Sequence, residues 1–316
     1  SKQALVFQLK NGVDYYLTTG GEVAAKTGDI KLTKSIALLA NPGERPTLYI
    51  REGCFIVKPE VGNMPNIEYF IVDNVNIKET WTESKPSKGS KTRLLNIGKH
   101  NAGTDFTIDR FEITNSDIVL PSTVLMMSDA SEGVTTINHI RIDNCLVSGI
   151  NDTKNVTKQF GFIHAINKGS NVWNDVSVTN STFYEFYISP GVFGAPTANC
   201  TFYNWGSNKD GKNTYRAVGN FSKLTAPLNL SVSNCVFGSS KSKVLDAGSI
   251  NLNSKDNYCT SDFEKMSDAG LTLISLDTDD ASLFRNVEEN DFTVVDAESV
   301  IYKSEYGDPR WIKVLD

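Results

Sequence analysis

The chain has 316 residues, of which 40% are hydrophobic and 22% are charged, and this composition is typical of a folded globular protein. Its formal net charge of −6 is the opposite of what nucleic acids and anionic membranes attract, so we expect no nucleic-acid partner. No apolar run approaches the roughly 18 residues of a membrane-spanning helix, and the opening SKQALVFQLK lacks a signal-peptide pattern, so we expect no transmembrane segment.

Residues 1–50 contain two or three strand-like runs separated by Gly and Pro turns. The run SIALLANPGERPTLYI (35–50) shows this best, because two apolar halves flank a turn with Pro and Gly. The end of a stack of strands exposes unpaired backbone and needs cover. We therefore predict that residues 1–50 form a first coil and an N-terminal cap.

From residue 72 onward a short pattern recurs: an apolar residue, any residue, Asn, a small or apolar residue, any residue and an apolar residue. Successive copies lie 19 to 41 residues apart, as in a solenoid whose coils carry loops of different length. Between them lie further strand-like runs, at 94–98, 124–128, 160–166, 215–221 and 244–250. The copies centre on Asn74, Asn115, Asn144, Asn180 and Asn234, with weaker ones at Asn199 and Asn257.

Asparagine has a physical reason to recur at a bend. Its side chain tolerates the left-handed backbone conformation, and amides stacked about 4.8 Å apart can bond to one another as a ladder. The residue that follows should then point inward and be small or apolar, as Cys145, Ser181, Cys200 and Cys235 are. Cys200 and Cys235 would lie in adjacent coils, either as a disulfide or as stacked free thiols, and their spacing leaves both open.

These features predict an all-β fold, a single parallel β-helix domain spanning residues 1–316. Residues 51–260 would form the main coils, and residues 261–316 the last coils and a C-terminal cap. The best candidate for a helix is the short run EKMSDAG (264–270), which ends at a glycine.

The Asn-centred repeats and the run SIALLANPGERPTLYI resemble the right-handed parallel β-helices of the pectin-lyase-like superfamily. The final NDFTV and GDPRW (307–311) are similar to the ending of uncharacterised Bacteroidetes surface β-helix lipoproteins linked to polysaccharide use. The resemblance implies an exported protein of the cell surface, extracellular space or periplasm. A lipid anchor or a preceding domain would then lie outside the sequence printed here.

Aromatic residues gather in consecutive coils, in FYEFY (183–187), FYNW (202–205) and Tyr215. Alternation would turn part of each set outward as a stripe suited to sugar faces, or the rings would stack inside the solenoid. The candidates for substrate contact are Tyr184, Tyr203, Trp205 and Tyr215.

Catalytic candidates are fewer. His164, if it projects outward, would have Lys168 on the following loop and Arg216 on a neighbouring coil, which together would form a cationic site for a uronate carboxylate. Acidic side chains that a calcium-dependent lyase needs are not paired, because Thr114 interrupts Asp73 and Asp143. We interpret the acidic run DTDD (277–280) as a solvated turn.

The expected function is therefore binding or processing of polysaccharide, such as a pectin-like or other uronic-acid glycan, with catalysis left open. A polysaccharide lyase or glycoside hydrolase and a structural or adhesive surface solenoid are the alternatives. We expect no cofactor, except calcium if the protein is a lyase.

Overall fold

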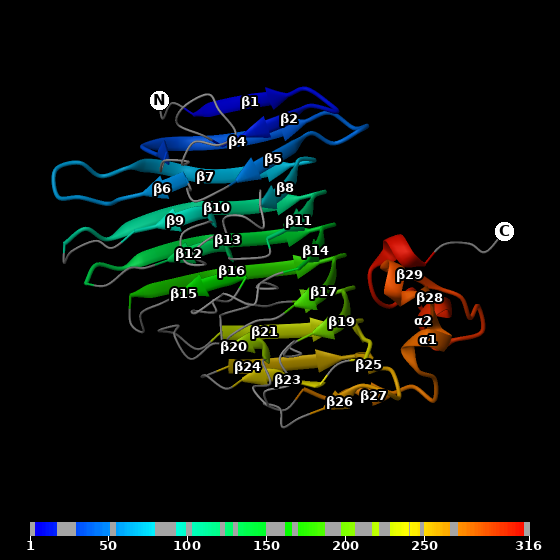
Figure 1. The fold of residues 1–316 in the computed structure, drawn as a ribbon. Helices are drawn as coiled ribbons and strands as arrows, with labels where there is room; N and C mark the ends of the chain where they lie inside the picture. The colour runs from blue at the N-terminus through cyan, green and yellow to red at the C-terminus, as the bar shows by residue number, and fades with distance from the viewer. Residues whose placement is uncertain are drawn as a thin grey trace, which may run out of the picture.

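The computed structural model describes residues 4–17, 30–50, 55–79, 93–98, 103–120, 124–128, 132–149, 162–165, 170–186, 197–205, 217–220, 228–239, 241–246, 250–265 and 271–312. Within these ranges the chain is mostly β-structure with a few short helices, and long parallel sheets run through the molecule (Figure 1). The all-β prediction is confirmed at this level.

Sheet A has nine strands, and every neighbouring pair in it is parallel. Apolar and polar residues alternate along its longer strands, so that Ile140 and Ile142 point into the core while His139 and Arg141 face outward. The strands, in spatial order, are β1 Leu5–Leu9, β4 Lys34–Ala40, β7 Asn66–Asp73, β10 Phe106–Thr114, β13 Thr135–Asp143, β16 Asn171–Thr179, β18 Thr197–Ala198, β21 Leu228–Ser233 and β24 Ile250–Lys255.

Sheet B has ten parallel strands, each of which follows a strand of sheet A in the chain, apart from the last. They are β2 Asp14–Tyr16, β5 Thr47–Ile50, β8 Asn76–Glu79, β11 Asp117–Val119, β14 Leu146–Ser148, β17 Thr182–Phe186, β19 Thr201–Trp205, β22 Val236–Phe237, β25 Tyr258–Cys259 and β27 Ile274–Ser275.

The further strand-like runs predicted between the Asn segments all contain strands. They form a five-stranded parallel sheet C and a three-stranded parallel sheet. Over most of its length the chain passes from sheet A to B to this third side and back to A, so one passage is called a coil below; the arrangement is compatible with the predicted parallel coils. The strands are β3 Ile30–Lys31, β6 Phe55–Val57, β9 Arg93–Ile97, β12 Val124–Ser128 and β15 Ile163–Ala165 in sheet C, and β20 Ala217–Asn220, β23 Lys241–Asp246 and β26 Glu264–Lys265 in the smaller sheet.

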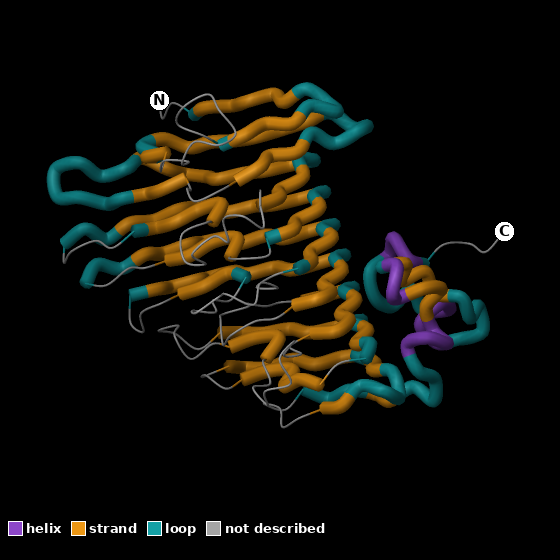
Figure 2. The backbone as a smooth tube through the Cα atoms, viewed as in Figure 1, coloured by secondary structure: helices purple, strands orange, loops and turns teal. Residues whose placement is uncertain are grey.

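Asparagine forms the tight turns between sheets A and B, as predicted (Figure 2). Asn144 donates from Nδ2 to Oδ1 of Asn115 over 2.7 Å, and Asn234 donates to Asn199 over 3.1 Å. The ladder is interrupted at two turns, where Asn115 donates to Asp73 instead of Asn74 and Asn180 donates to Asp143 instead of Asn144. The turn residues with positive φ are Asn74, Asn115, Asn144, Asn180, Asn199, Asn234 and Asp256.

The last of these turns corrects the predicted repeat by one position. Asp256, with φ of 52°, holds the left-handed conformation that we had expected of Asn257. Asn257 is instead buried, and its side chain donates to the Val232 carbonyl over 2.8 Å and accepts from the Cys235 amide over 3.1 Å. It therefore occupies the inward position that a cysteine or serine fills elsewhere.

The interior of the coils is a stack of equivalent side chains. Phe183, Phe202 and Phe237 stack in successive coils, with ring centroids 5.4 and 4.8 Å apart. The inward position after each turn asparagine is buried as predicted, and Cys200 and Cys235 are free thiols rather than a disulfide. The four described cysteines thus act as packing groups.

The C-terminal segment, defined here as residues 276–312, leaves the stack and packs on the outer face of sheet B (Figure 1). It therefore lies beside the coils, which corrects the expectation that it caps their end. The run 264–270 begins as strand β26 and not as the predicted helix. The segment consists of α1 Asp280–Leu283, β28 Phe284–Asn286, η1 Val287–Glu289, β29 Asp291–Val294, α2 Val300–Lys303 and η2 Pro309–Trp311, with β28 and β29 antiparallel.

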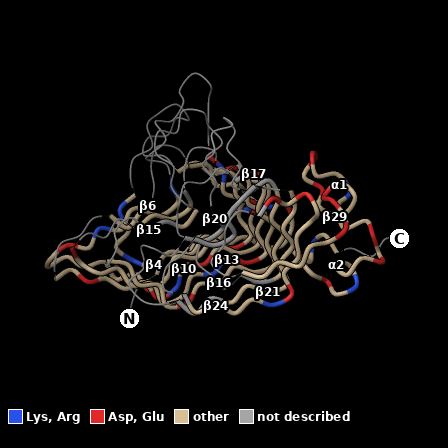
Figure 3. The backbone as a smooth tube through the Cα atoms, turned by 90° about the horizontal axis from the view of Figure 1, so that it is seen from below, with Lys and Arg blue, Asp and Glu red and all other residues tan. Residues whose placement is uncertain are grey.

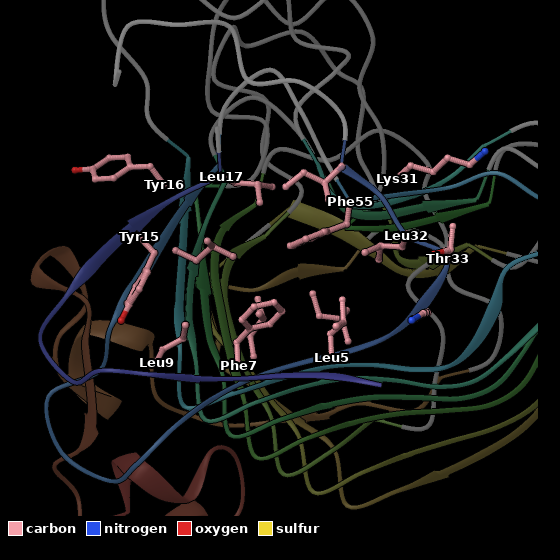
Figure 4. A pocket seen from close by; sticks show the side chains of 15 residues that line it. Leu5, Phe7, Leu9, Tyr15, Tyr16, Leu17, Lys31, Leu32, Thr33 and Phe55 are labelled. Carbon is pink, nitrogen blue, oxygen red and sulfur yellow. The ribbon is translucent and has the colours of Figure 1, made fainter. Parts of the chain in front are cut away.

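At the other end of the stack, strand β1 is the edge of sheet A and leaves apolar side chains in solvent. Leu5, Val6 and Phe7 are 45, 59 and 46% exposed. Leu5 and Phe7 line a cavity of about 350 Å³ together with apolar residues such as Leu9, Leu17 and Phe55 (Figure 4). Within residues 4–17 and 30–50, no helix or strand lies across this end, so the described residues do not test the predicted N-terminal cap.

Candidate functional site

The outer face of sheet A carries polar and charged side chains in rows that run across its strands. We define the charged face of sheet A as the outward residues of β7, β10, β13 and β16. One row of this face crosses all four strands, because the backbone register places Tyr69, Arg110, His139 and Asp175 side by side. Figure 3 views the stack from below and shows acidic and basic positions along these strands.

Tyr69 and Arg110 form one half of this row. The Arg110 guanidinium carbon lies 5.7 Å from the centre of the Tyr69 ring, within the range of a cation–π contact. Arg110 also pairs with Glu112 over 3.6 Å, and its side chain remains 43% exposed. The contact holds an aromatic ring and a cation together at the surface.

His139 and Asp175 form the other half. His139 Nδ1 lies 3.2 Å from Asp175 Oδ2, and both side chains are more than half exposed. A carboxylate at this distance orients the imidazole ring. The pair therefore presents the remaining imidazole nitrogen to solvent.

A second row, beside the first, contains a carboxylate that is fixed more firmly. Asp143 accepts from Thr179 over 2.7 Å and from Asn180 over 2.8 Å, and it pairs with Arg141 over 2.7 Å. Partial burial disfavours the charged carboxylate, but these hydrogen bonds outweigh it and lower the pKa of Asp143. Asp143 is therefore ionised at neutral pH.

Amide side chains form a further row on the same face. Asn138 donates to Asp109 over 3.1 Å, and Asn174 donates to Asn138 over 2.9 Å. Because neighbouring strands lie about 4.8 Å apart, the rows repeat hydrogen-bonding groups over a length of about 14 Å. Such a surface can bind a ligand rich in hydroxyl groups, and the ring of Tyr69 in the first row can contact an apolar sugar face.

The predicted catalytic group is not assembled by the described residues. His164 lies in β15 of sheet C, where its backbone pairs with Met127. Lys168 and Arg216 lie outside the described residues, as does Tyr215 of the predicted aromatic stripe. The cationic site therefore stays a prediction.

The remaining aromatic candidates lie on sheet B. Tyr184 and Tyr203 point away from the coils, but the C-terminal segment covers them, and their rings lie 5.5 and 5.4 Å from the ring of Phe292. Burial raises the pKa of both phenols. Tyr184 is only 9% exposed, so it offers no face to a sugar in this structure. Trp205 ends β19, opposite Phe186, and its side chain is not described.

The row on sheet A could have been found from the sequence. Tyr69, Arg110, His139 and Asp175 each stand five residues before a turn asparagine, so an alignment on these asparagines brings them into one column. His139 stands between Asn138 and Ile140, so no adjacent carboxylate marks it in the sequence. Its partner, Asp175, lies 36 residues further along the chain and is placed beside it on the neighbouring strand one coil later.

The described residues contain no ligand set for a metal ion. In the ranges that the structure covers, no group of three or more His, Cys, Asp or Glu side chains is placed to hold an ion. Asp73 and Asp143, the pair considered for calcium, are separated in the stack by Thr114, which donates to Asp73 over 2.6 Å.

Comparison with protein families gives a match in the C-terminal part of the chain. Residues 197–311 are similar to a family described as "Domain of unknown function (DUF5123)", which spans β18 to η2 and so includes the C-terminal segment. No curated protein matches the chain. None of the helices in the described ranges is long and apolar enough to cross a bilayer.

Proposed function

We propose that this chain is a right-handed parallel β-helix of the pectin-lyase-like kind, that it is exported to the cell surface or periplasm, and that it binds polysaccharide. The cyclic passage through parallel sheets and the asparagine ladder support the proposed architecture. Fold alone does not carry the proposed function, because such scaffolds host many activities.

The observation that carries the binding proposal is the row Tyr69–Arg110–His139–Asp175. It combines an aromatic ring, two nitrogen donors and a carboxylate in one line on an open face. The neighbouring amide row supplies donors and acceptors at the same spacing. A glycan chain that crosses the strands would find a polar or aromatic group at each strand.

A polysaccharide lyase or hydrolase is the second candidate, and the His139–Asp175 contact favours it. An imidazole oriented by a carboxylate can serve as a general base. Binding is preferred because the side chains of His139 and Asp175 are both more than half exposed, so water reaches the pair.

The test is a panel of polysaccharides scored for binding, for reducing ends and for unsaturated products, with and without calcium. We expect binding without turnover, and we expect Tyr69→Ala and Asp175→Ala each to weaken it about tenfold through the loss of ring contact or a charged acceptor. Tyr16→Ala is the matched control, because Tyr16 is a 44% exposed tyrosine on sheet B.

Binding that is equally weakened by Tyr16→Ala, or is absent from the whole panel, would refute the proposal. Turnover that disappears in His139→Ala would establish the enzyme instead.

A further inference from the structure

The charged face of sheet A has an excess of negative charge. The exposed or half-buried outward positions of β7, β10, β13 and β16 hold two guanidinium groups, from Arg110 and Arg141. The same strands hold six carboxylates, namely Glu68, Asp73, Asp109, Glu112, Asp143 and Asp175.

Both guanidinium groups already have a carboxylate partner on their own strand. Arg110 pairs with Glu112 over 3.6 Å, and Arg141 pairs with Asp143 over 2.7 Å. The imidazole of His139 faces Asp175. A uronate carboxylate would therefore have to compete with a fixed protein carboxylate at each cation.

From these charges we infer that the ligand class of this face is an uncharged, hydroxyl-rich glycan and not a polyuronate. The inference rests on the proposed function, and it reverses the uronic-acid expectation drawn from the sequence. Like charges at this spacing repel a polyanion over several contacts at once.

The same carboxylates suit neutral sugars. An ionised carboxylate accepts up to four hydrogen bonds and donates none, so it pairs with sugar hydroxyl groups as donors. Asp175 is more than half exposed, and Asp109 already accepts from Asn138 in the amide row. The face thus supplies acceptors in excess, which is what a polyol ligand can satisfy.

The experiment uses two polymers that differ only in charge: polygalacturonate and its carboxyl-reduced form, in which each carboxylate is a hydroxymethyl group. Neutral galactan, arabinan and xyloglucan complete the panel, and binding is measured with the whole chain at 50 and 500 mM NaCl. We expect at least one neutral polymer to bind with an affinity that salt changes less than about twofold, because no counterions are released. We also expect Asp175→Asn to weaken this binding, whereas Glu298→Gln, a change at an exposed carboxylate of the C-terminal segment, leaves it unchanged.

The outcomes separate the inference from the proposal beneath it. Salt-sensitive binding of polygalacturonate that is lost in Arg110→Ala and Arg141→Ala, without binding of neutral polymers, overturns the inference and leaves glycan binding intact. No binding to any polymer overturns both. Thermal unfolding of each variant shows that it is folded.

Discussion

Sheets A and B present two outer faces built by the same alternation, and they end in different environments. On sheet A, Tyr69 stays at the surface beside Arg110. On sheet B, Tyr184 and Tyr203 point outward in the same way but lie beneath the C-terminal segment. The comparison shows that strand periodicity decides the direction of a side chain, while a distant segment decides whether that direction leads to solvent.

A cluster of polar residues holds the C-terminal segment against sheet B. Thr182 donates to the buried carboxylate of Asp308 over 2.7 Å, and Trp311 donates to Thr182 over 2.6 Å. The amide of Asp308 donates to Thr201 over 3.0 Å. The residues GDPRW, which carried a resemblance in the sequence, therefore dock the segment onto two neighbouring strands.

Arg310 extends this docking to the turn ladder. Its guanidinium donates to Asn144 Oδ1 over 3.2 Å, at the point where Asn180 turns away to Asp143. Burial raises the pKa of Asp308, although Arg310 and Thr182 oppose that effect. The C-terminal segment and the asparagine ladder therefore belong to one hydrogen-bonded network.

The largest expected effect on stability comes from a substitution at the centre of the C-terminal segment. Phe292 is fully buried among Tyr184, Tyr203, Phe284 and Trp311. We expect Phe292→Ala to lower the free energy of unfolding by about 3–5 kcal/mol, through lost contacts and the cavity left behind. Urea denaturation followed by tyrosine and tryptophan fluorescence measures it.

Phe7→Ala is the control for an inward phenylalanine that no segment covers, since Phe7 lines the cavity at the end of the stack and is 46% exposed. Its unfolding free energy should change by less than about 1 kcal/mol. Equal losses in the two variants would mean that the C-terminal segment does not bury Phe292 as described.

A smaller loss is expected at the docking turn. Gly307 has φ of 88°, and a Cβ there would lie 2.9 Å from Thr201 Oγ1 and 3.2 Å from Val236 Cγ2. Gly307→Ala should therefore lower the free energy of unfolding by about 1–3 kcal/mol and weaken the packing of the C-terminal segment on sheet B. Faster hydrogen exchange of residues 284–294 would report the loosening.

Gly62→Ala separates strain from contact. Gly62 also has a positive φ, of 75°, but nothing lies within 4 Å of the added Cβ. This variant should lower the free energy of unfolding by only about 1 kcal/mol, because a residue with a Cβ is strained at this positive φ, and it should leave hydrogen exchange in the C-terminal segment unchanged. A comparable exchange response in both variants would contradict the docking role of Gly307.

The smallest effect concerns pH. Burial raises the pKa of Asp280 to about 7, and a hydrogen bond with Asp262 adds to it. The folded chain therefore holds this proton more tightly than the unfolded chain, so the contribution is complete below about pH 4 and is lost as the pH rises through 7. The lowered pKa of Asp262 acts in the opposite sense only below about pH 4.

Asp280→Asn keeps this position uncharged and should remove this group's share of the decline in stability between pH 5 and 8. Urea midpoints of the wild type and the variant, measured at both pH values, give the difference. An unchanged difference would show that Asp280 titrates normally. Asp280 is buried, with 7% of its surface exposed, which corrects the view of residues 277–280 as a wholly solvated turn.

Much of the fold was predictable because its signal is local. A turn that needs the left-handed conformation selects asparagine, and alternation marks the strands, so six of the seven predicted turn positions hold an asparagine with positive φ. The seventh failed because Asp256 and Asn257 are both able to occupy such a turn.

The candidate site was less predictable because its contacts are not local. His139 and Asp175 meet only through the register of β13 with β16. The burial of Tyr184 depends on Phe292, more than a hundred positions away, and no pattern around FYEFY indicates which segment covers it. Periodicity describes single strands, whereas these outcomes depend on which strands and segments become neighbours.

The asparagine ladder has a direction. Each amide nitrogen donates toward the coil that precedes it in the sequence, from Asn234 to Asn199, from Asn199 to Asn180, and at the far end from Asn74 to the Asn41 carbonyl. Every such bond joins only adjacent layers. Gain or loss of one complete layer would leave the other bonds intact, whereas a slip by a single residue would break the chain of amides, so the natural unit of length variation in this protein is a whole layer.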